Sequence, residues 1–184
     1  MSGAVERISK GDWIFHPTHG IGHVKKIEKK RIEGKKTRFF RVEQEYSTYW
    51  LPIEEIESSG VRRLASRAQF RRAVQLLCRA PRDMDPNYKK RQSRIRKIMS
   101  RGSLRGVVRV IRDLWARQQK NGLSYKDKRA LSHFIDNLVE EWSFAEEISN
   151  EDARLELYDL LKNGSFSLEE AGARGQLREV VKRG

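Results

Sequence analysis

The period of the hydrophobic residues changes near residue 65, and this change limits which folds the chain can adopt. Before it, short stretches rich in branched and aromatic residues alternate with turn-forming residues, a pattern typical of β-strands. After it, apolar residues recur every three to four positions, as they do in amphipathic helices. The change predicts an α+β chain, with a β domain over residues 1–64 and a helical domain over residues 65–164.

The first 64 residues contain four or five stretches with strand character. Strands this few and this short bury their apolar side by curling into a small barrel. We therefore expect a small N-terminal β-barrel. The expected strands are Asp12–Phe15, Ile21–Ile32, Thr37–Tyr46, Thr48–Ile53 and Val61–Leu64.

The second part of the chain is expected to be all-α, with about five helices. Each expected start has a residue that can cap the free N–H groups of a first helical turn. Asp85 precedes a proline, which is well placed in a first helical turn because it has no N–H to satisfy. Glycines interrupt the tail, residues 165–184, which we expect to be flexible. The helices are expected to begin near Ser66, Asp85, Ser103, Ser124 and Asn150.

Positive charge is concentrated in the middle third of the chain. The net charge is +14, and residues 61–112 hold 17 Lys and Arg against two acids, which gives +15. Helix surfaces usually mix both signs, so an unmixed run indicates a polyanionic partner, most commonly nucleic acid. Between Asp85 and Asp113 there is no acid but ten cations: Lys89, Lys90, Arg91, Arg94, Arg96, Lys97, Arg101, Arg105, Arg109 and Arg112.

Tyr88 begins this basic run and is followed directly by Lys89, Lys90 and Arg91. In one interpretation this segment binds duplex DNA: the cations bind phosphates, and the aromatic ring acts as a wedge that presses between bases. The alternative is that Tyr88 packs inward along its own helix. Both interpretations stay open from the sequence alone.

Other chemistry has little support in the sequence. Cys78 is the single cysteine, which excludes an internal disulfide and suits a reducing compartment. His16, His19 and His23 flank a Pro/Gly turn without accompanying cysteines, so we expect no metal site and no cofactor. No phosphate-binding glycine loop or nucleophile motif appears, and we expect no enzymatic activity. The N-terminus lacks the apolar core of a signal peptide, so we expect a cytoplasmic, nucleoid-associated protein.

Two ordered sets of motifs resemble the CarD/CdnL family of bacterial RNA-polymerase-binding transcription regulators. The first set is Gly11-Asp12-Trp13-Ile14-Phe15-His16-Pro17 with Gly20-Ile21-Gly22, Leu51-Pro52 and Gly60-Val61-Arg62. The second is Val110-Ile111-Arg112-Asp113-Leu114-Trp115 with Gly122-Leu123-Ser124 and Lys128. Each block alone is weak, but their combination and order are specific.

The resemblance implies a Tudor-like barrel that binds the β subunit of RNA polymerase, and a helical domain on promoter DNA at the upstream edge of the bubble. Family members stabilise the open complex with a tryptophan wedge, whose position Tyr88 occupies here. The resemblance also implies DNA contacts by Lys90, Arg91 and Lys128, and we expect the adjacent Lys89 to join them. For polymerase binding it implies Lys30, where some members carry an arginine, and Trp50, where others carry arginine or an apolar residue. We expect Arg31, next to Lys30, to take part as well.

We therefore expect a monomeric transcription regulator with two partners, RNA polymerase and double-stranded promoter DNA. One alternative is a stand-alone DNA-binding or architectural protein, suggested by the departures from the family at Lys30 and Trp50. Another is an RNA-binding module, since small barrels and basic helices also suit structured RNA.

Overall fold

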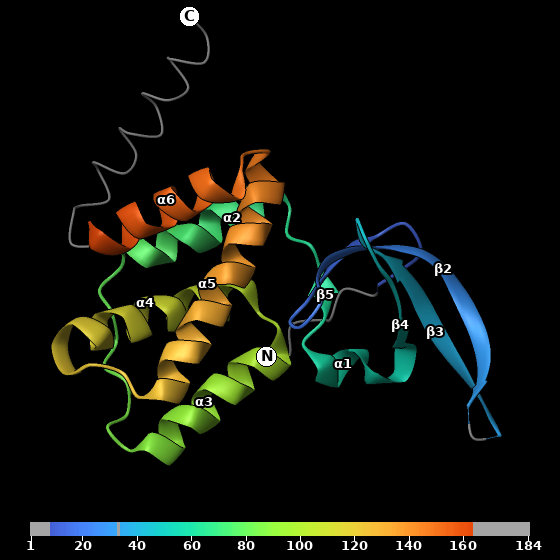
Figure 1. Ribbon diagram of the computed structural model, residues 1–184, viewed down its shortest axis with the longest axis horizontal. Helices are drawn as coiled ribbons and strands as arrows, with labels where there is room; N and C mark the ends of the chain where they lie inside the picture. Colours follow the sequence, from blue (N-terminus) through green and yellow to red (C-terminus); the bar gives the residue numbers. More distant parts are fainter. Residues whose placement is uncertain (1–7, 33, 164–184) are drawn as a thin grey trace, which may run out of the picture.

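A computed structural model describes residues 8–32 and 34–163, which form a curved β-sheet followed by a helical bundle (Figure 1). The predicted tail after Gly164 lies outside the described residues. The buried apolar residues form two clusters. One belongs to the sheet and includes Ile14, Val24 and Val42, and a larger one belongs to the helices. The α+β fold class is confirmed.

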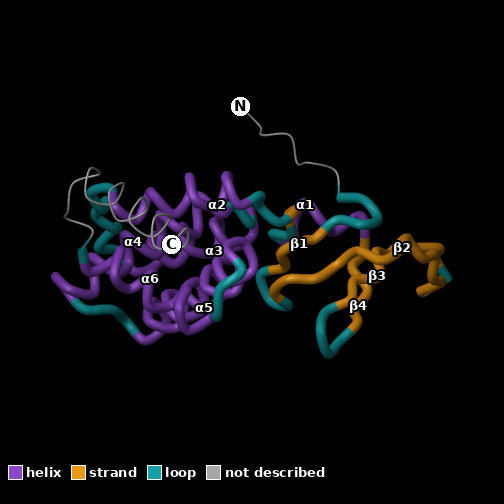
Figure 2. The backbone as a smooth tube through the Cα atoms, turned by 90° about the horizontal axis from the view of Figure 1, so that it is seen from above, coloured by secondary structure: helices purple, strands orange, loops and turns teal. Residues whose placement is uncertain are grey.

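The N-terminal sheet is antiparallel, with the strand order β4-β3-β2-β1-β5. Its strands are β1 (Trp13–His16), β2 (Gly20–Ile32), β3 (Lys35–Glu43), β4 (Thr48–Pro52) and β5 (Arg62–Arg63). A register shift between Val24 and Lys26 bends β2, because a bulge increases the local twist of a strand. The sheet curves around its core (Figure 2), which fits the expected Tudor-like domain.

The helical domain places one hydrophobic stripe of each helix in a common core. Its helices are α2 (Arg67–Val74), α3 (Tyr88–Arg101), α4 (Leu104–Asn121), α5 (Tyr125–Glu146) and α6 (Asn150–Lys162), while the short α1 (Ile56–Ser59) belongs to the sheet domain. Ser66 and Gln69 form the predicted capping box of α2. Ser103 and Ser124 cap α4 and α5, also as predicted.

The predicted start of α3 was wrong by two residues. Asn87, not Asp85, is the N-cap, and its side chain accepts the N–H of Lys90 at 3.2 Å. Arg91 explains the shift. Its guanidinium donates to the carbonyl oxygens of Asp85 (2.8 Å) and Pro86 (3.2 Å), so these two residues stay outside the helix.

A close contact between two glycines joins the domains. Gly60 and Gly102 both have positive φ, and a Cβ added to Gly102 would lie 1.8 Å from the carbonyl oxygen of Gly60. Beside them, Arg62 forms an ion pair with the buried Glu141 of α5 and donates to the carbonyl of Gly102. Burial raises the pKa of Glu141 more than Arg62 lowers it. Side chains at these two glycines would force the domains apart.

Candidate interaction surfaces

Tyr88 lies in the first turn of α3 and is 40% exposed. This exposure disfavours the alternative in which Tyr88 packs into the core. Lys89 and Lys90 follow it, are also exposed, and form no ion pair with any described residue. The start of α3 therefore presents an aromatic ring and two free ammonium groups to solvent.

Arg91 does not belong to this exposed group. It is only 4% exposed, and its Nε and Nη2 donate to Asp127 Oδ2 at 3.0 and 2.9 Å. Its third nitrogen is occupied by backbone carbonyls. This environment disfavours the expected phosphate contact of Arg91, because the guanidinium is buried and its hydrogen bonds are already satisfied within the domain.

The Arg91–Asp127 pair brings the start of α3 beside the start of α5. Asp127 is fully buried and also accepts hydrogen bonds from Gln92 (2.7 Å) and Ser124 (2.8 Å). Burial alone would raise the pKa of Asp127, but the hydrogen bonds from Arg91, Ser124 and Gln92, together with the positive charge of Arg91, outweigh it and hold that pKa below its usual value. The carboxylate is therefore charged at neutral pH and connects the two helix ends.

The first turn of α5 therefore adds exposed side chains to the surface at the start of α3. Lys128 is exposed and lies one residue beyond Asp127. Tyr125 is 73% exposed, and Arg129 lies 5.9 Å from its ring. We call Tyr88, Lys89, Lys90 and Lys128 the Tyr88 surface. Tyr125 was not among the predicted site residues, because only the ion pair between Arg91 and Asp127 brings the first turn of α5 to the start of α3.

The basic run of α3 and α4 is partly neutralised in the fold. Asp113 is buried and pairs with Arg94 at 2.6 Å and with Arg112 at 2.7 Å. The expectation of ten uncompensated cations was therefore wrong for Arg91, Arg94 and Arg112. Seven cations remain exposed without an ion pair among the described residues: Lys89, Lys90, Arg96, Lys97, Arg101, Arg105 and Arg109.

A second candidate surface lies on the sheet, around Trp50 of β4. The indole is 43% exposed, and its Nε1 donates to Glu28 Oε2 at 2.7 Å. The ammonium of Lys30 lies 3.4 Å from the ring centroid, and Lys26 pairs with Glu28 at 2.7 Å. Hydrogen bonds from Lys26 and Trp50 lower the pKa of Glu28. These four residues form one continuous patch, which we call the Trp50 face.

The predicted polymerase residues are divided between two sides of the sheet. Lys30 stacks on Trp50, so these two predicted residues lie on the same surface. Arg31 is the next residue of β2, and successive side chains of a strand point to opposite faces. The structure therefore brings Lys30 and Trp50 together and places Arg31 on the other side.

The Trp50 face lies at the edge of the sheet. In the described residues, β4 pairs only with β3, so its outer edge is open (Figure 2). An open edge can accept a strand of another protein through backbone hydrogen bonds. An aromatic ring beside such an edge supplies side-chain specificity as well.

Of the three histidines near the start of the sheet, His16 and His19 bound the turn between β1 and β2, and His23 lies in β2. His16 Nδ1 accepts the backbone N–H groups of Thr18 (3.0 Å) and His19 (3.2 Å). Burial, and then the charge of His19, lower the pKa of His16 to about 4, so it is neutral at neutral pH. Within residues 8–32 and 34–163, no three His, Cys, Asp or Glu side chains are placed to hold a metal ion. The described helices also include none that is long and apolar enough to cross a membrane.

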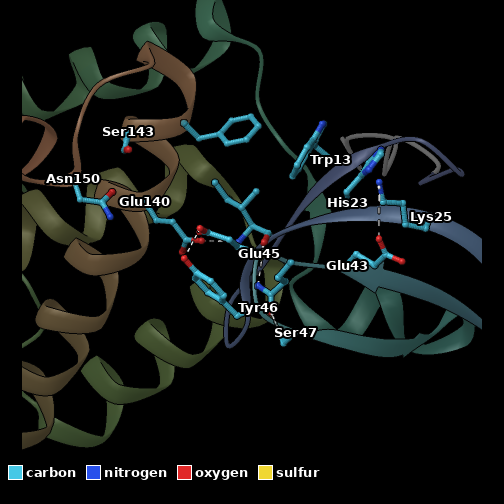
Figure 3. Close-up of a pocket in the computed structure, with 13 residues that line it drawn as sticks. Trp13, His23, Lys25, Glu43, Glu45, Tyr46, Ser47, Glu140, Ser143 and Asn150 are labelled. Carbon is cyan, nitrogen blue, oxygen red and sulfur yellow. Dashed lines mark hydrogen bonds and ion pairs between the residues drawn. The ribbon is translucent and has the colours of Figure 1, made fainter.

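A cleft of about 660 Å³ lies between the sheet and α5 (Figure 3). Trp13 forms one wall, with its ring 5.0 Å from Phe144 and stacked on His23. Glu140 on the other side accepts the N–H of Ile21 at 2.9 Å. Since these residues contact one another across the cleft, they contribute to the joint between the domains.

The fold and its surfaces define a two-domain binding protein, in which a curved sheet with an open edge is fixed to a basic helical domain. Residues 8–65 match the family model of the CarD-like/TRCF RID domain, and residues 72–158 match that of the CarD C-terminal domain. The chain belongs to the CarD/CdnL family, whose members are transcription regulators that interact with RNA polymerase and are not catalysts.

Proposed function

We propose that this protein binds the β subunit of RNA polymerase through its sheet domain and promoter DNA through its helical domain, and that it stabilises the open complex. The observation that carries the proposal is the Tyr88 surface. It combines an exposed aromatic with three exposed lysines that have no ion pair among the described residues, on two helices whose first turns are held together by a buried ion pair.

On the polymerase side, the Trp50 face and the open edge of β4 support the proposal. An exposed tryptophan is among the residues that most often dominate the energy of protein interfaces. Backbone addition at the β4 edge would give affinity, and the indole with Lys30 would give specificity. Lys26, Glu28 and Lys30 surround the ring with charges that a polymerase surface can complement.

On the DNA side, the lysines of the Tyr88 surface bind phosphates and Tyr88 presses against the bases at the upstream edge of the bubble. Phosphate contacts fix the position of the protein, and an inserted ring stabilises unstacked bases. Arg91 acts indirectly: it holds α3 against α5 so that Tyr88 and Lys128 can reach the same DNA.

The joint between the domains supports this division of labour. Gly60 and Gly102 are in close contact, and Arg62 is bound to Glu141, so the Tyr88 surface keeps a fixed position relative to the sheet. A protein docked on polymerase would thereby present Tyr88 at one place on the DNA.

The test is the lifetime of a promoter open complex after challenge with a competitor. Tyr88→Ala should shorten the lifetime given by the wild-type protein, with binding to polymerase unchanged. Tyr88→Trp should lengthen it, because indole has a larger stacking area. An unchanged lifetime in Tyr88→Ala would exclude the wedge role.

A further inference from the structure

The charge of the sheet domain is concentrated in one hairpin. Residues 1–60 hold eleven Lys and Arg and nine acids, a difference of only +2. Nine of the eleven cations, but only two of the nine acids, lie in residues 25–41, which therefore carry +7. A count over the whole domain hides this segment, which forms most of β2 and β3.

The strand register places like charges directly opposite each other near the tip of the hairpin. Lys29 faces Arg38, and Arg31 faces Lys36. Like charges in such cross-strand positions destabilise a sheet. All four residues are exposed, and among the described residues none of them forms an ion pair. Because Lys29 and Arg31 are two residues apart, both pairs lie on the same face. We call it the hairpin cation face.

The other side of the same hairpin is different. Lys26 and Lys30 there share the carboxylate of Glu28, at 2.7 and 4.0 Å. The hairpin thus pairs the lysines of the Trp50 face with Glu28, whereas the cations of the hairpin cation face have no ion pair among residues 8–32 and 34–163.

Near its tip, the β2–β3 hairpin no longer pairs with β4. The pairing of β4 with β3 ends at Pro52 opposite Phe39, so beyond that point β2 and β3 continue as a two-stranded ribbon. Figure 1 shows this ribbon projecting from the sheet on the side away from the helices. Among the described residues, four cations line a depression near the tip: Lys29, Lys30, Arg31 and Lys36.

We propose that the hairpin cation face binds the phosphate backbone of duplex DNA, as a second DNA contact separate from the Tyr88 surface. Four cations on a projecting ribbon, with no ion pair in the part of the chain that the structure describes, match a polyanion, whose charge removes the repulsion between the facing pairs. Two-stranded ribbons also have dimensions that fit a DNA groove.

An acidic protein surface is the less suitable partner. The cores of protein interfaces are depleted in lysine and enriched in aromatic residues. The hairpin cation face has no aromatic residue, whereas Trp50 lies on the opposite side of the hairpin. The hairpin therefore has one side suited to protein and one side suited to DNA.

The experiment measures binding of the full-length protein to a duplex DNA over a range of salt concentrations, without polymerase. The test variant is Arg31→Gln/Lys36→Gln, which removes one facing pair. Its matched control is Arg154→Gln/Lys162→Gln, which removes two charges from α6 on the far side of the molecule (Figure 1). A third variant, Lys89→Gln/Lys90→Gln, reports on the Tyr88 surface separately.

We expect the test variant to lower the slope of log affinity against log salt by about 1.8, at about 0.9 per lost phosphate contact. At about 0.1 M salt its Kd should rise on the order of tenfold or more. Its melting temperature should stay the same or increase, because one repulsive pair is gone.

Equal affinity and slope in the test variant and the α6 control would overturn the proposal. If Lys89→Gln/Lys90→Gln still weakened binding in that case, DNA binding by the helical domain would stand and only the hairpin contact would fail. Loss of polymerase binding with unchanged DNA affinity would also overturn it, since it would identify an acidic protein surface as the partner.

Discussion

Two carboxylates each accept several hydrogen bonds near an exposed aromatic residue, but one is at the surface and the other is buried. They are Glu28, which lies beside Trp50, and Asp127, which binds the helix that begins with Tyr88. Glu28 supports Trp50 at the surface, where its side chain is 22% exposed and its partners are flexible lysines. Asp127 is fully buried and binds the guanidinium of Arg91 in the turn after Tyr88. Solvent and salt weaken the first kind of contact much more than the second.

This difference has a functional meaning. The Trp50 face can adjust its side chains to a partner, because its ion pairs are exposed and individually weak. The Tyr88 surface is preorganised, because a buried network fixes the two helix ends on which it stands. Preorganisation reduces the entropy lost on binding. Substitutions at the two sites should therefore have effects of different size and kind.

The largest effect is expected from Asp127→Asn. It leaves Arg91 buried without a counter-charge, and breaking a buried pair in this way costs about 3–5 kcal/mol in the free energy of unfolding. Urea denaturation measures this loss. Asp136→Asn, which breaks an exposed pair with Arg154, is the matched control and should cost less than about 1 kcal/mol.

The same pair predicts a pH dependence. The pKa of Asp127 is lower in the folded protein than in the unfolded chain, so its contribution to stability is present at neutral pH. It disappears as the pH falls through the lowered pKa. The stability difference between wild type and Asp127→Asn should therefore shrink in acid, and a constant difference would contradict the charged-pair account.

An intermediate effect is expected from Trp50→Ala on affinity for polymerase. Buried interface tryptophans contribute about 2 kcal/mol or more, which corresponds to a roughly 30-fold rise in Kd. A direct binding assay with purified polymerase measures it, and the melting temperature should change little because Trp50 lies at the surface and is not part of the buried core. Wild-type affinity in this variant would remove Trp50 from the interface.

The smallest effect is expected from Lys30→Ala. Its ammonium stacks on the Trp50 ring, and an exposed cation–π contact is worth about 0.5–1 kcal/mol, or a two- to fivefold change in Kd. Lys30→Arg keeps the stacking and should bind polymerase like wild type. An effect of Lys30→Ala as large as that of Trp50→Ala would contradict a contribution of the size of one exposed cation–π contact.

Much of the fold could be predicted from local signals. The change of period near residue 65 separated the sheet from the helices, and the serine caps fixed three helix starts because capping depends on neighbouring residues. The start of α3 could not be predicted in the same way. It depends on Arg91, whose carboxylate partner lies 36 residues further along the chain.

The candidate sites were less predictable, because they depend on pairing between distant segments. A charge count treats Arg91 and Lys90 alike, although one is buried and the other is exposed. A count over the first 60 residues gives a small net charge and so does not reveal the basic hairpin. That Arg31 faces Lys36 follows only from the strand register, which joins positions distant from a local pattern. The alternation of side chains along β2 could have assigned Lys30 and Arg31 to opposite faces of the strand, because this rule needs no tertiary information.

The central claim is that two separate surfaces serve two partners, and one paired measurement tests it directly. Affinity for polymerase without DNA and open-complex lifetime at saturating protein are measured for Trp50→Ala and Lys89→Gln/Lys90→Gln. We predict that Trp50→Ala binds polymerase weakly but restores the full lifetime at saturation. The lysine variant should bind polymerase normally and never reach that lifetime. The opposite pattern, or a loss of both properties in each variant, would contradict the account.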